Sequence, residues 1–299
     1  MSHVENETAS QPECWRRAAE VAVGRAAAPA LPAAGERVAV VGCGTSYYMA
    51  QAYAALREAS GQGESDAYAA SEFPFGRVYD RVVALTRSGT TTEVLGLLSR
   101  LRGTTRTVVV TADPHTPVEG AADEMVVLDF ADERSVVQTR FATTALTLFR
   151  AHLGLHTDQA VRDAETALAQ PLPDGVLECS QFSFLGRGWT VGLANEAALK
   201  MKEASLSWTE SYPAMEYRHG PISIATAGTA TWMLGAAPEG LAEQVRSTGA
   251  RWVESTLDPL ADLVRVQRLA IARAAARGLD PDLPRHLTRS VVLDGAAEV

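Results

Sequence analysis

Two short, hydroxyl-rich turns constrain the fold of this chain more than any other feature. One turn has the sequence GCGTS at residues 42–46, and the other has TRSGTT at residues 86–91. Each follows an apolar, β-branched run and precedes a helical pattern, which is the strand–turn–helix unit of a parallel α/β sheet. At such a turn, free backbone N–H groups and the positive end of the helix dipole lie beside Ser and Thr hydroxyls. Two of these turns in one sheet predict a phosphate-binding site.

The remaining sequence alternates in the same way. Strands are expected at residues 37–41, 65–69, 80–85, 105–111, 124–128, 181–185, 229–234 and 253–256. Helices are expected at residues 13–28, 47–59, from the second turn to 101, and at 118–123, 139–153, 158–169, 194–207, 241–247 and 258–277. The pattern predicts an α/β fold with two similar doubly wound, flavodoxin-like parallel-sheet lobes.

Prolines and a glycine at residues 171–175 mark the break between the two lobes. After this break a new strand, a glycine-containing turn and a helix follow one another, as they do in the first lobe. The expected division is an N-terminal helical segment at 1–33, a first lobe with both turns at 34–157, a connecting helix and linker at 158–174, and a second lobe with the C-terminal tail at 175–299.

Composition excludes several classes of protein. The net charge of -9 and the scattered arginines argue against a nucleic-acid partner. Cys14, Cys43 and Cys179 lack the paired spacing of a disulfide framework, and the histidines show no ligand spacing, so neither a metal nor another cofactor is expected. No apolar run reaches the roughly 18 residues of a membrane helix, and the polar start lacks a signal-peptide core. We therefore expect a cytoplasmic protein without a membrane partner.

The two turns supply the candidate phosphate ligands. These are Gly44, Thr45 and Ser46 in the first turn and Thr86, Arg87, Ser88 and Thr91 in the second. Hydroxyl and main-chain N–H groups donate to phosphoryl oxygens, and an arginine adds a charge-assisted contact. Two other interpretations remain open. The hydroxyls could only cap helices, whereas a dinucleotide site would need a third glycine, which residues 45–47 do not supply, and an acidic residue after the next strand.

A second candidate site lies on the helix expected at residues 194–207. Glu196, Lys200 and Glu203 are spaced i, i+4 and i+7, so one helix face carries two carboxylates and an ammonium group. The spacing alone is also that of a solvated, salt-bridged face. A carboxylate in a site could act first as a base and then as an acid, moving a proton between neighbouring carbons.

Four segments carry a resemblance to a known family. They are VVGCGTSYYMAQAYAAL, ALTRSGTTTEVLGLL, GRGWTVGLANEAALKMKEASLSWTESYPAMEYRHGP and DLPRHLTRSVVL. Through both lobes they resemble the sugar isomerase (SIS) family, specifically the isomerase half of glucosamine-6-phosphate synthase. The resemblance implies sugar-phosphate binding. Because the chain starts shortly before the first strand, without a cysteine at position 2, the glutaminase domain of the synthase is not expected, nor glutamine as nitrogen source.

The resemblance also implies roles for individual residues. The glutamate that matches Glu203 moves a proton between C1 and C2 of the open-chain sugar phosphate, and the lysine that matches Lys200 lies beside it. The histidine that matches His219 assists ring opening and commonly reaches into a neighbouring subunit's site, which implies a homodimer. Val136 and Gln138 fall in a segment that is expected to line the substrate pocket.

The chain departs from the synthase at several of these positions. Arg87 stands where the synthase has glutamine, and Thr86 and Gln138 stand where it has serine, which implies an altered substrate pocket. Arg289 in the C-terminal tail stands where the synthase has a catalytic lysine. Because a guanidinium stays protonated, Arg289 can bind or polarise but cannot form a Schiff base with a ketose. Ketose amination is therefore not expected.

The reactions that remain share one step, removal of the proton at C2 of an aldose phosphate. The leading hypothesis is an amino-sugar-6-phosphate isomerase/deaminase, which reprotonates C1 and releases ammonia and a ketose phosphate. The alternative is a dehydratase or lyase that expels the C3 oxygen from an N-acetylhexosamine 6-phosphate such as N-acetylglucosamine 6-phosphate. A second alternative is a sugar-phosphate sensor without turnover, which would not need Glu203 and His219 together.

Overall fold

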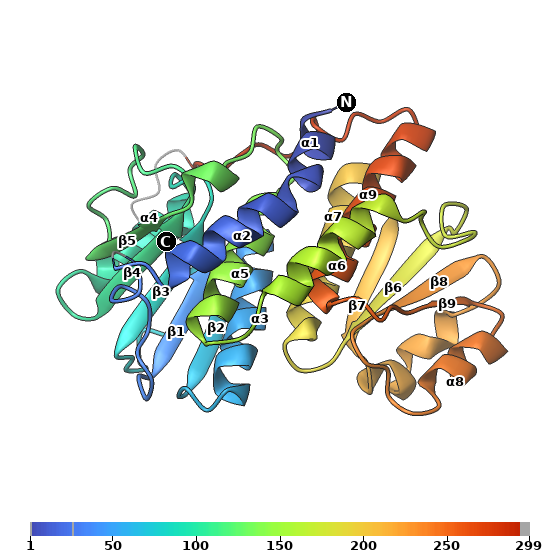
Figure 1. Ribbon diagram of the computed structural model, residues 1–299, viewed down its shortest axis with the longest axis horizontal. Coiled ribbons are helices and arrows are strands. Elements are labelled where there is room, and N and C mark those ends of the chain that lie inside the picture. Colours follow the sequence, from blue (N-terminus) through green and yellow to red (C-terminus); the bar gives the residue numbers. More distant parts are fainter. Residues whose placement is uncertain (1, 26, 294–299) are drawn as a thin grey trace.

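The computed structural model describes residues 2–25 and 27–293, which form two α/β lobes side by side (Figure 1). Within these ranges, the first lobe holds a five-stranded parallel sheet in the order β2-β1-β3-β4-β5. Its strands are β1 (Val38–Gly42), β2 (Ser65–Ala69), β3 (Arg81–Thr86), β4 (Arg106–Thr111) and β5 (Glu124–Val127). Its helices are α1 (His3–Ala9), α2 (Gln11–Ala22), α3 (Thr45–Ala59), α4 (Thr92–Leu101) and α5 (Arg140–His152), with 3₁₀ turns η1 (Ala70–Glu72) and η2 (Asp129–Ala131).

The second lobe, over the same described part of the chain, holds a four-stranded parallel sheet in the order β7-β6-β8-β9. Its strands are β6 (Gln181–Gly186), β7 (Trp208–Pro213), β8 (Thr229–Leu234) and β9 (Arg251–Val253). Its helices are α7 (Thr190–Ser205), α8 (Leu241–Ser247) and α9 (Pro259–Ala276), with 3₁₀ turns η3 (Glu216–His219) and η4 (Pro221–Ile224), and α6 (Asp158–Ala169) precedes this lobe. The predicted α/β fold with two parallel-sheet lobes is confirmed.

The helix expected at residues 118–123 is wrong, because this segment forms turns. The Val118 N–H donates to the Gly89 carbonyl at 3.1 Å, which ties the segment to the turn after β3. Gly120 adopts a φ of 71°, outside the range of a right-handed helix. A tertiary contact and a glycine therefore override the short helical pattern.

Other elements also differ from the expectation, among them β9, which spans Arg251–Val253 where a strand was expected at residues 253–256. The helix predicted to reach residue 28 ends at Ala22, just before Gly24, the residue type that most weakens a helix after proline. The strand β7 is not predicted, since it is an edge strand whose side chains do not alternate cleanly between buried and exposed. Such a strand lacks the period-two apolar pattern on which recognition of strands depends.

The central strands of the first sheet are buried on both faces. Every residue of β1 and β3 is buried, as expected for parallel strands between two layers of helices. In one layer, Tyr53 of α3 stacks on Phe149 of α5 with ring centroids 4.0 Å apart. Trp15 of α2 donates from Nε1 to Thr143 Oγ1 at 2.9 Å. The stacked rings join α3 to α5, and the hydrogen bond joins α2 to α5, so the three helices of this layer are packed together.

Helices α3 and α7 pack against each other where the lobes meet (Figure 1). The two hydrogen bonds between them show that they run in opposite directions. Asn195 Nδ2 of α7 donates to Gln51 Oε1 of α3 at 2.7 Å. Further along, Lys200 Nζ donates to Thr45 Oγ1, at the first residue of α3, at 2.9 Å. The later part of α7 therefore lies beside the first hydroxyl-rich turn.

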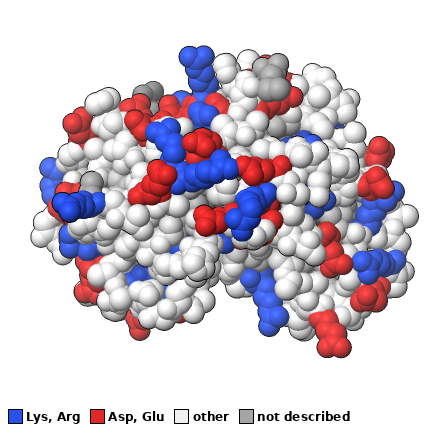
Figure 2. Space-filling model, in the orientation of Figure 1, with Lys and Arg blue, Asp and Glu red and all other residues white. Residues whose placement is uncertain are grey.

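The molecular surface carries charges of both signs. On the face shown in Figure 2, acidic and basic side chains lie next to one another near the upper centre and along the right-hand edge, and most of the remaining surface carries no charge. Where opposite charges lie side by side on this face, their electric fields largely cancel. Among the described residues, no helix is long and apolar enough to cross a membrane, and no group of three His, Cys, Asp or Glu side chains is placed to hold a metal ion.

Gly192→Ala is expected to lower the free energy of unfolding by about 1 to 3 kcal/mol, the cost of overpacking a close contact. An added Cβ would lie 2.5 Å from the Tyr48 carbonyl oxygen and 2.8 Å from the Ala52 nitrogen, so α3 and α7 would have to separate. Urea unfolding measures the change.

Gly76→Ala is the matched control, since no described atom lies within 4 Å of a Cβ at that position. We expect this variant to change the free energy of unfolding by less than about 0.5 kcal/mol. Equal stability of the Gly192 and Gly76 variants would contradict the close approach of the two helices.

Candidate active site

A cavity of about 220 Å³ lies at the carboxyl ends of β1 and β3, where the two hydroxyl-rich turns meet. Its lining consists of Cys43, Gly44 and Thr45 after β1, Arg87 and Thr91 after β3, Val136 and Gln138 before α5, Glu203 of α7, and residues 287–291 of the C-terminal tail. This is the edge of a parallel sheet at which α/β proteins bind their ligands. We call this space the strand-end cavity.

Most of the predicted site residues line the strand-end cavity, namely Gly44, Thr45, Arg87, Thr91, Val136, Gln138, Glu203 and Arg289. The predicted residues that do not line it but are buried are Ser46, Thr86, Ser88 and Lys200. His219 is exposed on η3 and lies outside the lining of this chain's cavity.

Sequence reasoning missed the remaining lining residues, Cys43, Leu287, Thr288, Ser290 and Val291. The available signal was their position inside matched segments, next to residues that were singled out. Burial, and to a lesser extent the charge of Glu93, raises the pKa of the Cys43 thiol to about 11. Cys43 is therefore a neutral thiol at neutral pH, and its contribution to the cavity is shape.

The first turn directs the N-terminus of α3 to the strand-end cavity. Gly42 permits the tight turn, because a Cβ there would lie 2.7 Å from Ser46 atoms. Gly44 has a φ of 54° and is the N-cap of α3, with Thr45 as the first helical residue. The unpaired N–H groups and dipole of a helix N-terminus attract an anion.

The second turn is held together largely by its own hydroxyls. Thr86 Oγ1 accepts from the Gly89 N–H at 3.2 Å, and Ser88 Oγ accepts from the Thr90 N–H at 3.3 Å. Thr91 is the N-cap of α4, yet its hydroxyl makes no capping bond to the helix. Among the hydroxyls of this turn, Thr91 is the one that lines the cavity.

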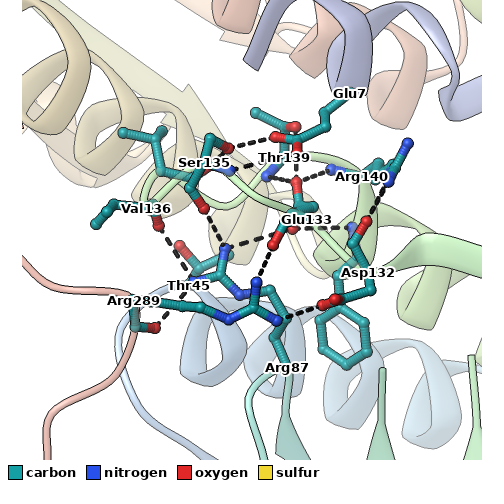
Figure 3. Close-up of polar contacts among 12 residues, drawn as sticks. Glu7, Thr45, Arg87, Asp132, Glu133, Ser135, Val136, Thr139, Arg140 and Arg289 are labelled. Carbon is teal, nitrogen blue, oxygen red and sulfur yellow. Dashed lines mark hydrogen bonds and ion pairs between the residues drawn. The ribbon is translucent and has the colours of Figure 1, made fainter. Parts of the chain in front are cut away.

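Arg87 is almost completely buried and contacts two separate segments (Figure 3). Its guanidinium donates to the carbonyl oxygens of Ser135 at 3.0 Å, Val136 at 3.3 Å and Arg289 at 2.9 Å. It also lies 3.7 Å from the carboxylate of Glu133. Burial lowers the pKa of Arg87, and the charge of Glu133 opposes that change.

The C-terminal tail forms one wall of the strand-end cavity and is attached to the first lobe. The guanidinium of Arg289 pairs with Asp132 at 2.5 Å and donates to the Glu133 carbonyl (Figure 3). The Thr92 N–H, at the start of α4, donates to the Val291 carbonyl at 3.1 Å. The tail therefore brings a second arginine to the cavity.

Lys200 connects the acidic helix face to the first turn. Its Nζ donates to Glu203 Oε2 at 2.5 Å and to Thr45 Oγ1 at 2.9 Å, and lies 3.4 Å from Glu196 Oε1. Lys200 and Glu196 are each 1% exposed, whereas the side chain of Glu203 is 18% exposed and lines the cavity. The solvated-face interpretation of this helix is therefore wrong. Glu203 is the carboxylate of the set that can reach a ligand.

Burial and neighbouring charges shift the two buried groups of this set. Burial raises the pKa of Glu196 to about 8, with Lys200 opposing the rise and Glu203 adding to it. Burial acts to lower the pKa of Lys200, but Glu196 and Glu203 outweigh it, so the pKa is raised. Lys200 is therefore an ammonium at neutral pH, and it can stabilise negative charge beside Glu203.

In sequence and in fold the chain is similar to sugar isomerase (SIS) proteins, which confirms the resemblance seen in the motifs. No family model matches the chain. Over 87% of its length it is 27% identical to a glutamine–fructose-6-phosphate aminotransferase (isomerizing) of Methanothermobacter thermautotrophicus and 28% identical to that of Gloeobacter violaceus. The chain spans 52% of each of these relatives, about half of their length.

Solved structures show the same architecture. Glucosamine-6-phosphate deaminase from Thermotoga maritima matches with a TM-score of 0.80 and 25% identity, covering 98% of this chain and 100% of that one. The C-terminal domain of glucosamine-fructose-6-phosphate aminotransferase from Francisella tularensis matches with a TM-score of 0.77 and 20% identity, covering 95% and 98% of the two chains. The second of these likenesses concerns the fold alone.

Glu196→Gln is expected to gain stability relative to the parent protein as the pH rises. The pKa of Glu196 lies at about 8 in the folded protein, against an ordinary value of 4.5. Between these values the folded state binds more protons than the unfolded state, so the parent loses stability as the pH increases, and the glutamine variant does not lose this contribution. Chemical denaturation from about pH 5 to about pH 8 measures the difference.

The matched control is Glu243→Gln, which neutralises a carboxylate that is 73% exposed on α8. Its stability relative to the parent should change little over the same pH range, since most of this side chain lies in solvent in the folded protein. If the difference in free energy of unfolding between Glu196→Gln and the parent is also independent of pH, Glu196 does not carry the proton.

Proposed function

We propose that this chain is a phosphosugar-processing enzyme that acts on an amino-sugar 6-phosphate by removing the proton at C2. The reaction that we propose is that of a glucosamine-6-phosphate isomerase/deaminase. The observation that carries the proposal is the chain of contacts from Glu203 through Lys200 to Thr45. It couples a carboxylate at the cavity directly to the helix N-terminus that suits a phosphate.

The terminal phosphate is assigned to the region between the two turns. Gly44 and Thr45 offer main-chain N–H groups at the N-terminus of α3, and Thr91 offers a hydroxyl that does not cap its own helix. Arg87 adds a buried positive charge. These are the kinds of groups that bind a phosphoryl group in parallel α/β proteins.

The chemistry follows from the acidic helix face. Glu203 removes the proton from C2 of the open-chain aldose, giving an enolamine, and returns a proton at C1. The resulting C2 imine reacts with water and releases ammonia and the ketose phosphate. Lys200 stays protonated and stabilises the negative charge that develops on the sugar oxygen, while Arg289 can polarise the same oxygen from the tail.

We also propose a homodimer in which His219 completes the partner's site, and a cytoplasmic location. His219 is exposed on η3, away from the strand-end cavity of its own chain, so a role in catalysis would need a second copy. The free thiols of Cys14, Cys43 and Cys179 fit a reducing compartment.

Glu203→Gln is expected to lower kcat with glucosamine 6-phosphate by about 10² to 10⁴, the contribution of a general base. Binding of the sugar phosphate, measured by calorimetry, should be retained, because the phosphate is assigned to other residues. Glu243→Gln on α8 is the control and should keep full activity. A Glu203 variant that turns over at the parent rate would contradict the assigned base.

Product analysis distinguishes the proposed reaction from elimination. Purified protein is incubated with glucosamine 6-phosphate and, separately, with N-acetylglucosamine 6-phosphate. Ammonia and fructose 6-phosphate from the first substrate are the expected products. An ultraviolet-absorbing enal or enone from the second substrate, without ammonia from the first, would identify a lyase instead, and binding without turnover of either would identify a sensor.

A mixing experiment tests the shared site. Equal amounts of Glu203→Gln and His219→Asn proteins, each inactive alone, should regain about a quarter of the parent activity after subunits exchange, because half of the dimers then hold one intact site. Activity that stays at the level of the separate variants after exchange would place both residues in the site of one chain. Analytical ultracentrifugation verifies that dimers form.

A further inference from the structure

Arg87 has contacts that binding a phosphate would not require. Its guanidinium donates to the carbonyls of Ser135 and Val136 in the first lobe and to the carbonyl of Arg289 in the C-terminal tail (Figure 3). Arg289 lies 202 residues further along the chain. One side chain therefore joins the turn after β3 to the tail across the strand-end cavity.

The segment that Arg87 contacts in the first lobe is held in place by hydrogen bonds of Glu133. Glu133, 3.7 Å from Arg87, accepts hydrogen bonds from the main-chain N–H groups of Thr139 at 2.6 Å and Arg140 at 2.8 Å. These N–H groups open α5, so the carboxylate lies at the positive end of a helix dipole. When Arg87 is substituted, the carboxylate of Glu133 therefore keeps its hydrogen bonds to the start of α5. The substitution removes the contact with the tail without leaving a buried charge that has no partner.

One donor of Arg87 is left without a partner in the described part of the chain. Its Nε is buried and has no hydrogen-bond partner among the described residues, while Arg87 itself lines the cavity. A buried donor without a partner costs free energy, and an oxygen of a bound anion can relieve that cost. The guanidinium can therefore hold an anion through Nε and the tail through an Nη group at the same time.

We propose that Arg87 is a positioning residue that couples anion binding at the turn after β3 to the placement of residues 287–291 over the strand-end cavity. Two more tail contacts lie at or next to this turn, since Thr91 Oγ1 lies 3.3 Å from Ser290 Oγ and the Thr92 N–H donates to the Val291 carbonyl. The anion half of the proposal rests on the proposed function, in which the anion is a sugar phosphate. The tail half stands on the contacts alone.

Trypsin cleavage after Arg289, followed by mass spectrometry of the full chain, reports the position of the tail. The guanidinium of Arg289 is held by Asp132 and by the Glu133 carbonyl. Trypsin can therefore bind this side chain only after the tail is released. We expect Arg87→Gln to be cleaved about tenfold faster, as the loss of a charge-assisted hydrogen bond would produce. Arg87→Lys retains the charge and should restore part of the protection.

Arg81→Gln is the matched control. Arg81 begins β3, the strand that Arg87 follows, is buried to the same degree, and pairs with Glu36 at 3.0 Å and Glu124 at 3.3 Å. Its loss removes an equally buried guanidinium far from the tail. Cleavage after Arg289 at the parent rate is expected, and acceleration equal to that of Arg87→Gln would overturn the proposal in favour of general loosening of the lobe.

Inorganic phosphate is the probe for coupling, since it requires no turnover. Added phosphate should slow cleavage of the parent and of Arg81→Gln, and should not slow cleavage of Arg87→Gln. Equal slowing in all three proteins, or slowing in none, would overturn the coupling. If the deaminase assay fails while these rates differ as expected, the proposed reaction is wrong and the role of Arg87 stands.

Discussion

One buried ammonium group, that of Lys200, holds the candidate site together. A charge that is 1% exposed must be compensated, because removing it from water costs several kcal/mol without partners. Thr45 of the first lobe and the carboxylate of Glu203 supply that compensation, while Glu196, whose pKa is raised to about 8, lies 3.4 Å away. Since α3 and α7 also touch closely at Gly192, the carboxylate of one lobe keeps a fixed position relative to the helix N-terminus of the other.

A second set of charges, of which Arg87 and Glu133 are buried, supports another wall of the strand-end cavity. Arg87 and Arg289 both contact the segment that holds Glu133, and Glu133 in turn caps α5. Glu7 of α1 accepts from the Arg134 N–H at 2.6 Å, so the N-terminal helix braces the same segment. Elements that are distant in sequence therefore form one wall together. The shape of the cavity depends on segments outside the two hydroxyl-rich turns.

Local signals predicted much of the fold. The two turns, and the strands β1 and β3 before them, follow from glycines, hydroxyls and apolar runs that act within a few residues. The edge strand β7 and the turns at residues 118–123 could not be read in this way. The first lacks a regular apolar pattern, and the second is held by the hydrogen bond from Val118 to Gly89, which exists only in the folded chain.

The sequence by itself determined the parallel α/β architecture, the two turns and the alignment of Glu196, Lys200 and Glu203 on one helix face, because each depends on local spacing. Tertiary structure decided which of these groups face the strand-end cavity. Thr86 and Ser88 brace their own turn, whereas Thr91 reaches the cavity. Only packing across 155 and 202 residues brings Lys200 to Thr45 and Arg87 to the tail, and only the resulting burial raises the pKa of one carboxylate so far above its ordinary value.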